Sequence, residues 1–93
     1  MRLSELNSET RAQLQAPDDV KGAVVARVQP GSPADNAGLA AGDVIQSVNR
    51  KPTQSAADVK EALSKIPNGE DALVRIWSQG GSTFRVMHSG NQG

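Results

Sequence analysis

The residues that could carry out acid–base or nucleophilic chemistry are few and poorly placed for it. A serine-based catalytic triad needs a histidine within hydrogen-bond reach of the serine, and the only histidine is His88, close to the C-terminus. Residues 80–82 read Gly-Gly-Ser, but they lack the Gly-x-Ser-x-Gly elbow that hydrolases place between a strand and a helix. The sequence therefore predicts no catalytic residue, and His88 is interpreted as an exposed terminal side chain.

Metal and phosphate chemistry find no better support. The chain has no cysteine, so a metal site would have to be built mainly from carboxylates, and the acidic pairs at 18–19 and 70–71 have no third acid at ligand spacing. Neither glycine-rich phosphate-binding pattern, GxGxxG or GxxxxGK[ST], occurs in the sequence. We expect no metal and no cofactor, and the acids are interpreted as solvated loop residues.

Composition and charge narrow the possible partners. The 10 basic and 10 acidic side chains cancel and are interspersed, and only Trp77 and Phe84 are aromatic, so a nucleic acid would find neither a basic patch nor a stacking platform. No apolar stretch approaches the ~20 residues of a membrane span, and no secretory signal is recognisable. We expect neither nucleic-acid binding nor direct membrane insertion. A cysteine-free chain leaves the redox compartment open.

The elements that must position any functional residue are short. Alternation and turn residues predict strands at 2–6, 22–28, 44–48, 72–77 and 82–87, and helical segments at 8–14, after Ser32 and, longest, from Ser55 to Pro67. Short strands far apart in the sequence favour an α+β fold. We expect a small antiparallel β-barrel or sandwich of five to six strands, capped by two helices.

Periodicity also predicts which side chains face inward. On the strand that begins at residue 22 these are Val24, Ala26 and Val28, with Arg27 facing water. On the last two strands they are Val74, Ile76, Phe84 and Val86. On the longest helix Val59, Leu63 and Ile66 form one apolar stripe. Truncating Leu63 to alanine is expected to cost about 2–5 kcal/mol.

Residues 31–49, GSPADNAGLAAGDVIQSVN, are the most informative segment. Ser32 can cap a short helix, and Pro33 at its first position removes only an N–H that would lack a partner. Gly38 stands where the helix needs a left-handed C-terminal residue, and Gly42 makes a turn into the next strand. This pattern resembles the core signature of PDZ domains, in particular those of bacterial trypsin-like serine proteases of the HtrA/Deg type.

The resemblance extends from about residue 3 to residue 86, through matching segments at 22–25, 30–34, 37–39, 42–45 and 48–49. It implies a single PDZ-like domain at residues 1–88, with the bacterial, circularly permuted strand order, and a flexible tail or linker at 89–93. It further implies that the chain is a fragment of a periplasmic serine endoprotease involved in protein quality control. The catalytic triad of that protease would lie outside the fragment.

The function implied by the resemblance is peptide binding. In this family an extended or C-terminal apolar segment adds as a strand between the first strand and the longest helix. The site residues implied here are Met1, Arg2, Leu3, Ser4, Ala56, Lys60 and Leu63. Backbone groups of the first strand would pair with the peptide, Leu63 would floor an apolar pocket, and Lys60 would favour an acidic side chain.

One departure from the family pattern concerns the loop that receives the peptide carboxylate. The family places an x-Φ-G-Φ motif, where Φ is apolar, just before the first strand, and no such motif precedes Leu3. We therefore expect impaired carboxylate capture and weak binding by an isolated domain that is monomeric. Two alternatives stay open, namely an assembly module that stabilises protease oligomers and the PDZ domain of another processing protease.

Overall fold

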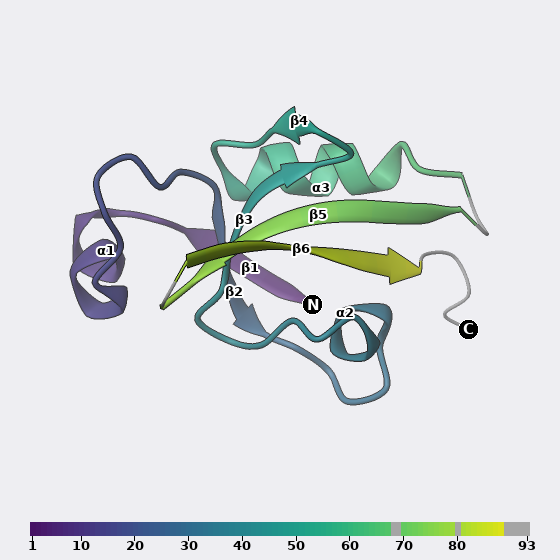
Figure 1. Cartoon of the computed structure of the whole chain (residues 1–93), viewed down its shortest axis with the longest axis horizontal. Helices are drawn as coiled ribbons and strands as arrows, with labels where there is room; N and C mark the ends of the chain where they lie inside the picture. The colour runs from purple at the N-terminus through teal and green to yellow at the C-terminus, as the bar shows by residue number, and fades with distance from the viewer. Residues whose placement is uncertain (68–69, 80, 89–93) are drawn as a thin grey trace.

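The backbone of the chain forms one antiparallel sheet with helices packed around it (Figure 1). The computed structural model describes residues 1–67, 70–79 and 81–88. Within them the strands are β1 (Arg2–Glu5), β2 (Ala23–Arg27), β3 (Val44–Val48), β4 (Lys51–Pro52), β5 (Asp71–Ser78) and β6 (Gly81–His88), and the helices are α1 (Ser8–Leu14), α2 (Pro33–Asn36) and α3 (Ala56–Ser64). The expected tail at 89–93 lies outside the described residues.

The sheet has the order β1-β2-β3-β5-β6, with β4 paired to β3 off this path. All of these pairings are antiparallel. The predicted α+β class and strand number are confirmed. The sheet is open, because β1 and β6 each have a strand on one side only within the described residues. Each of these edge strands therefore presents a row of backbone groups that the sheet itself does not use.

The two helices with predicted caps begin where the sequence places them. The Ser32 hydroxyl accepts a hydrogen bond from the Asp35 N–H at 3.3 Å and starts α2, and the Ser55 hydroxyl accepts one from the Asp58 N–H at 3.1 Å and starts α3. The Asp58 carboxylate in turn accepts from the Gln54 N–H at 3.0 Å. These bonds satisfy N–H groups that a helix start leaves without a partner.

Helix α1 covers residues 8–14, as predicted, and ends at Leu14. Gln15 adopts the left-handed conformation with φ 58°, and its N–H turns back to the carbonyls of Ala12 and Arg11. The Arg11 side chain then donates to the carbonyls of Pro17 and Val20. These bonds hold the loop that follows α1 against the helix.

Apolar side chains are buried on both faces of the sheet. The inner cluster, which α2 and α3 cover, consists of Ala23, Val25, Ala34, Leu39, Ile45, Val48, Val59, Ala72, Val74, Ile76 and Met87. The outer cluster, which the loop after α1 covers, consists of Ala16, Val20, Val24, Val44 and Trp77. Neighbouring residues of β2 and β3 alternate between the two clusters, as successive side chains of a strand must.

The predicted inward face of β2 is wrong at two positions, because Val24 belongs to the outer cluster and Ala26 is exposed. Ala26 is exposed, whereas Val24 and Val25 are both buried. The reason is that the loop after α1 covers the outer face, so the start of β2 is buried on both sides and does not follow a simple alternation. Val28 is half-buried against the inner cluster and Arg27 is exposed, as predicted.

The predicted inner face of β6 is also wrong. Val74 is buried, but Phe84 is 54% exposed and Val86 is 48% exposed. Directly paired residues of antiparallel strands share a face, and the register pairs Phe84 with Arg75 on the outer side of the sheet. The buried residue of β6 is Met87 instead. The parity of the β5–β6 register decides this, because a shift of one residue moves every side chain to the opposite face.

Candidate functional site

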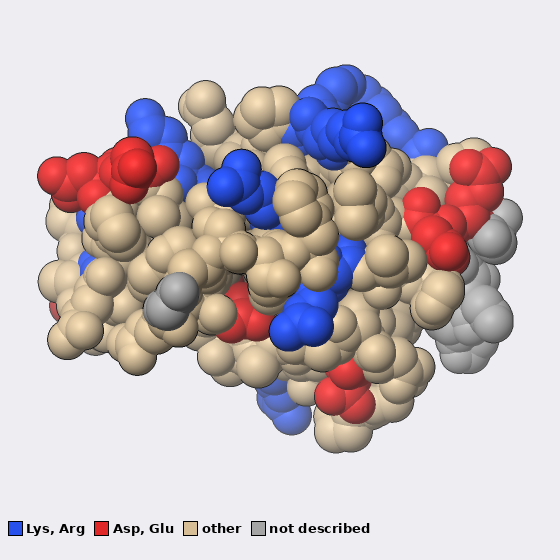
Figure 2. Space-filling view, in the orientation of Figure 1, with Lys and Arg blue, Asp and Glu red and all other residues tan. Residues whose placement is uncertain are grey.

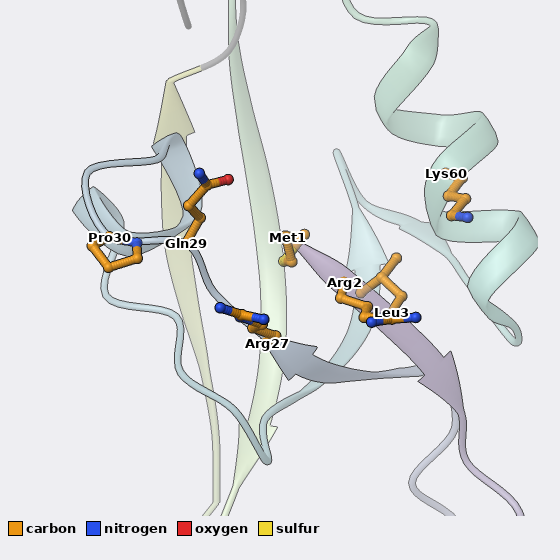
Figure 3. A pocket seen from close by; sticks show the side chains of 7 residues that line it. All are labelled: Met1, Arg2, Leu3, Arg27, Gln29, Pro30 and Lys60. Carbon is orange, nitrogen blue, oxygen red and sulfur yellow. The ribbon is translucent and has the colours of Figure 1, made fainter.

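A hollow opens where the first residues of β1 meet the end of β2, opposite α3 (Figure 3). Its volume is about 790 Å³. The residues that line it are Met1, Arg2, Leu3, Arg27, Gln29, Pro30 and Lys60. They come from the edge strand, from the end of β2 with the residues after it, and from the middle of α3. We call this hollow the β1–α3 cavity.

The structure brings together four of the seven site residues named from the sequence, which are Met1, Arg2, Leu3 and Lys60. The other three lie nearby but do not line the cavity. Ser4 is exposed on β1. Ala56 is half-buried at the start of α3, and Leu63 is half-buried against the inner cluster. Leu63 therefore does not floor this cavity.

Sequence reasoning missed Arg27, Gln29 and Pro30 as lining residues. Arg27 reaches the cavity because β1 and β2 pair in a register that places it opposite Arg2. The sequence indicates only that Arg27 faces water, and nothing local to it signals which strand lies alongside. The missing signal was the β1–β2 pairing itself.

The backbone of Leu3 points to the open edge of the sheet. Its partner Val25 uses both backbone groups on the other side of β2, donating to the Asp43 carbonyl at 2.8 Å and accepting from the Gly42 N–H at 2.9 Å. Leu3 and Val25 therefore form a pair without mutual hydrogen bonds. In such a pair the N–H and C=O of Leu3 face away from β2. They are positioned to bond an incoming strand.

One hydrogen bond joins β1 to α3 at one end of the groove between them. The N–H of Ala56, the first residue of α3, donates to the Glu5 carboxylate at 3.3 Å. Leu3, Ala56 and Leu63 also pack against the inner cluster. The edge strand and the helix are thus held side by side by the core and by this bond.

The charge around the cavity is of one sign. Arg2, Arg27 and Lys60 are exposed cations, and the lining includes no acidic residue. Elsewhere both signs occur, and Figure 2 shows basic and acidic side chains interspersed among uncharged ones on the face that it draws. Since the whole chain has a formal net charge of zero, the cavity is a local concentration of positive charge.

His88, the one candidate acid–base residue, lies at the end of β6. Its Nδ1 atom is 2.7 Å from the Asp71 carboxylate on the paired strand, and both side chains are largely exposed. In the described part of the chain no hydroxyl group hydrogen-bonds to this imidazole. The described residues also contain no group of three potential metal ligands, and none of their helices is long and apolar enough to cross a membrane.

The turn residues Asp43 and Asn49 have structural partners, as the sequence predicts. The Asn49 amide oxygen accepts from the Leu73 N–H at 2.8 Å, and the Asp43 carboxylate accepts from the Ala40 N–H at 3.0 Å. Burial raises the pKa of Asp43 above its usual 3.8, and the Ala40 hydrogen bond and the positive charge of Arg85 oppose that shift. The carboxylate of Asp43 is therefore a partly desolvated charge in the folded chain.

The pH dependence of the stability should reveal the raised pKa of Asp43. Because the folded chain holds the Asp43 proton more tightly than the unfolded chain does, the contribution of this group to stability is fully present below pH 3.8 and is lost as the pH rises through the raised pKa. The variant Asp43→Asn has no carboxyl group that ionises at this position, so it should not lose this stability as the pH rises. Its amide oxygen can still accept from the Ala40 N–H. Urea unfolding from pH 3 upward should show the variant gaining stability relative to the parent chain. A difference independent of pH would contradict this account.

Comparison with known protein families gives a match over most of the sheet. A family model described as PDZ domain matches residues 24–78. Among curated proteins, the periplasmic serine endoprotease DegP of Salmonella typhimurium is 39% identical over 77 residues, covering 83% of this chain and 16% of that protein. A probable periplasmic serine endoprotease DegP-like of Hahella chejuensis is 34% identical over 92 residues, covering 99% of this chain and 19% of that protein. The chain thus spans less than a fifth of the length of these relatives.

Solved structures share the fold at lower identity. The HtrA3 PDZ domain bound to a phage-derived ligand, FGRWV, superimposes with a TM-score of 0.79 at 21% identity, covering 95% of this chain and 80% of that one. The HtrA-type protease AlgW with a decapeptide gives a TM-score of 0.84 at 21% identity, covering 96% of this chain and 27% of that one. At this identity the likeness describes the arrangement of the strands and helices.

Proposed function

The chain belongs to the PDZ domain family, and we propose that it is a peptide-binding regulatory module of a periplasmic serine endoprotease of the HtrA/DegP type. The observation that carries the proposal is the open edge of β1 beside α3, with the backbone groups of Leu3 directed outward. Relatives named as periplasmic serine endoproteases, and related folds solved with peptides, support it. In this role the module serves protein quality control by holding extended or C-terminal apolar segments.

Strand addition explains how such a module binds unrelated sequences. An extended peptide placed beside β1 gains main-chain hydrogen bonds that do not depend on its side chains. Side chains that alternate toward α3 would meet Leu3 and the apolar parts of the helix, which adds a preference for apolar residues. On β1 the outward backbone groups of Leu3 would form the pairing surface, because those of the adjacent Ser4 point back to β2. The cost of ordering the peptide keeps such binding weak.

Catalysis belongs to another part of the parent protein in this proposal. A PDZ domain is a binding unit, and the chain corresponds to only 16–19% of the length of its DegP-like relatives. The parent is a serine endopeptidase whose nucleophile and base lie outside this chain. The module would bring substrate or signal peptides to that catalytic domain.

An NMR titration tests the groove. We expect an extended apolar peptide with an amidated C-terminus to shift the amide resonances of Leu3 and of α3 residues from Ala56 to Leu63, because the peptide bonds the former and contacts the latter. Residues of β6, on the opposite edge, serve as the internal control. Shifts confined to β6, or none at millimolar peptide, would refute the proposed function.

A second candidate is assembly within a protease oligomer. The observation that favours it is the exposure of Phe84 and Val86 on the outer face of β6, where Arg75 lies 5.9 Å from the Phe84 ring. An assembly surface would show concentration-dependent resonance shifts around Phe84 in the absence of any peptide. The same spectra used for the titration therefore separate the two functions.

A further inference from the structure

The cations of the β1–α3 cavity come from three separate elements that the fold brings to one opening. Arg2 lies on β1, Arg27 ends β2, and Lys60 lies in the middle of α3, on the other side of the cavity from β1 (Figure 3). The β1–β2 register shifts between Leu3 and Arg2, so that Ala26 has no partner on β1 and Arg27 lies directly opposite Arg2 at the cavity. The three charges therefore line one opening beside the edge at which an added strand would lie.

This arrangement is unfavourable unless something neutralises it. Arg2 and Arg27 are direct partners in the β1–β2 register, and like charges directly opposite each other destabilise a strand pair. In the described residues the ion pairs are Lys65–Glu61 and His88–Asp71, and neither involves these three cations. Their side chains also make no hydrogen bond there. An anion in the cavity would relieve the repulsion.

We propose that the β1–α3 cavity binds an acidic side chain of the peptide, so that this chain selects extended segments carrying aspartate or glutamate among their apolar residues. The inference rests on the proposed function, because it needs a strand paired at Leu3. A carboxylate of that strand that enters the cavity would lie among Arg2, Arg27 and Lys60. Arginine matches a carboxylate with a bidentate fork, and lysine adds a point charge. A terminal carboxylate has the same chemistry and must be distinguished by experiment.

Three peptides of one apolar sequence make that distinction. The first carries glutamate at alternate positions and an amidated C-terminus, the second carries glutamine at those positions and the same amide, and the third is the glutamine peptide with a free carboxylate. We expect the first to bind about tenfold more tightly than the second. Because the attraction is between largely exposed charges, the preference should shrink several-fold in 1 M salt.

Charge removal identifies the residues responsible. The double variant Arg27→Gln with Lys60→Gln should bind the glutamate and glutamine peptides with nearly equal affinity. Lys65→Gln is the matched control, since it removes one charge from the same segment at a residue outside the cavity. It should keep the tenfold preference. All three side chains are exposed, so the amide spectrum of each variant should retain the native dispersion.

The outcomes separate this inference from the function on which it rests. Equal affinity for the glutamate and glutamine peptides, with both shifting the Leu3 amide, would overturn the acidic selectivity and leave peptide binding intact. A gain only for the free carboxylate would assign the cavity to the peptide terminus and would also overturn it. Failure of every peptide to shift the Leu3 amide would refute the proposed function itself.

Discussion

Replacing Gly22 with alanine is expected to leave the chain unfolded. A Cβ atom at Gly22 would lie 1.8 Å from the carbonyl oxygen of Ile45 and 2.8 Å from its carbonyl carbon, and the φ angle of Gly22 is +142°. The obstacle is backbone of the neighbouring strand, which cannot rotate away as a side chain can. Relief requires β2 and β3 to separate at the middle of the sheet. The expected loss, more than about 4 kcal/mol, is comparable to the whole stability of a small domain.

Gly31→Ala is the matched control for this variant. Gly31 also has a positive φ, +80°, but nothing lies within 4 Å of the position that a Cβ would occupy. The substitution should cost only about 1–2 kcal/mol, the usual penalty of a left-handed residue with a side chain. Circular dichroism and urea unfolding measure both variants. Equal urea midpoints for the two alanine variants would show that the contact with Ile45 does not control stability.

Replacing Ile45 with alanine is expected to produce the second largest effect. Ile45 is completely buried in the inner cluster, between the sheet and the covering helices. Removing most of its side chain leaves a cavity, and such substitutions cost about 2–5 kcal/mol. Because Val59 of α3 belongs to the same cluster, the loss should also loosen α3 against the sheet and weaken peptide binding beside β1. The measurements are the urea midpoint and the peptide titration.

Val86→Ala provides the comparison on the exposed side of the sheet. Val86 is 48% exposed on β6, so its truncation should change the free energy of unfolding by no more than about 0.5 kcal/mol. If Val86→Ala destabilised the chain as much as Ile45→Ala, the outer face of β6 would have to be covered in solution. That result would favour the assembly function over the peptide-binding one.

The stripe on α3 illustrates how far periodicity can be trusted. Val59 and Leu63 on α3, and Ile66 just after the end of the helix, all pack against the inner cluster, as the spacing predicts. Their burial differs, however, because Val59 is completely buried while Leu63 and Ile66 are only half-buried. The truncation of Leu63 is therefore expected to cost less than a central core residue such as Ile45. Spacing determines the face of a helix, but depth depends on what lies opposite.

The candidate site was predictable only in part, because pairing between distant strands decides some of its residues. The resemblance to PDZ domains located the edge strand and the facing helix, and four of the seven named residues line the cavity. Arg27 could not be found this way, since it enters the site through its pairing with Arg2, across 24 residues of intervening sequence. The concentration of positive charge was also hidden, because the net charge of the chain is zero.

The sequence by itself determined the features that depend on neighbours within a few residues. Ser32 and Ser55 start their helices through bonds to N–H groups three residues away, and Gly38 and Gly42 adopt the positive φ that their turns require. The physical reason is that these bonds and torsions involve only adjacent backbone. Their energies hardly depend on the rest of the fold.

Only the tertiary structure decided which strands lie together and which faces they bury. The β5–β6 register placed Phe84 on the outer side, the loop after α1 buried the second face of β2, and the β1–β2 pairing gathered cations around one cavity. Each outcome depends on contacts between segments distant in sequence. A one-residue shift in such a pairing reverses every side chain, and no local pattern contains that information.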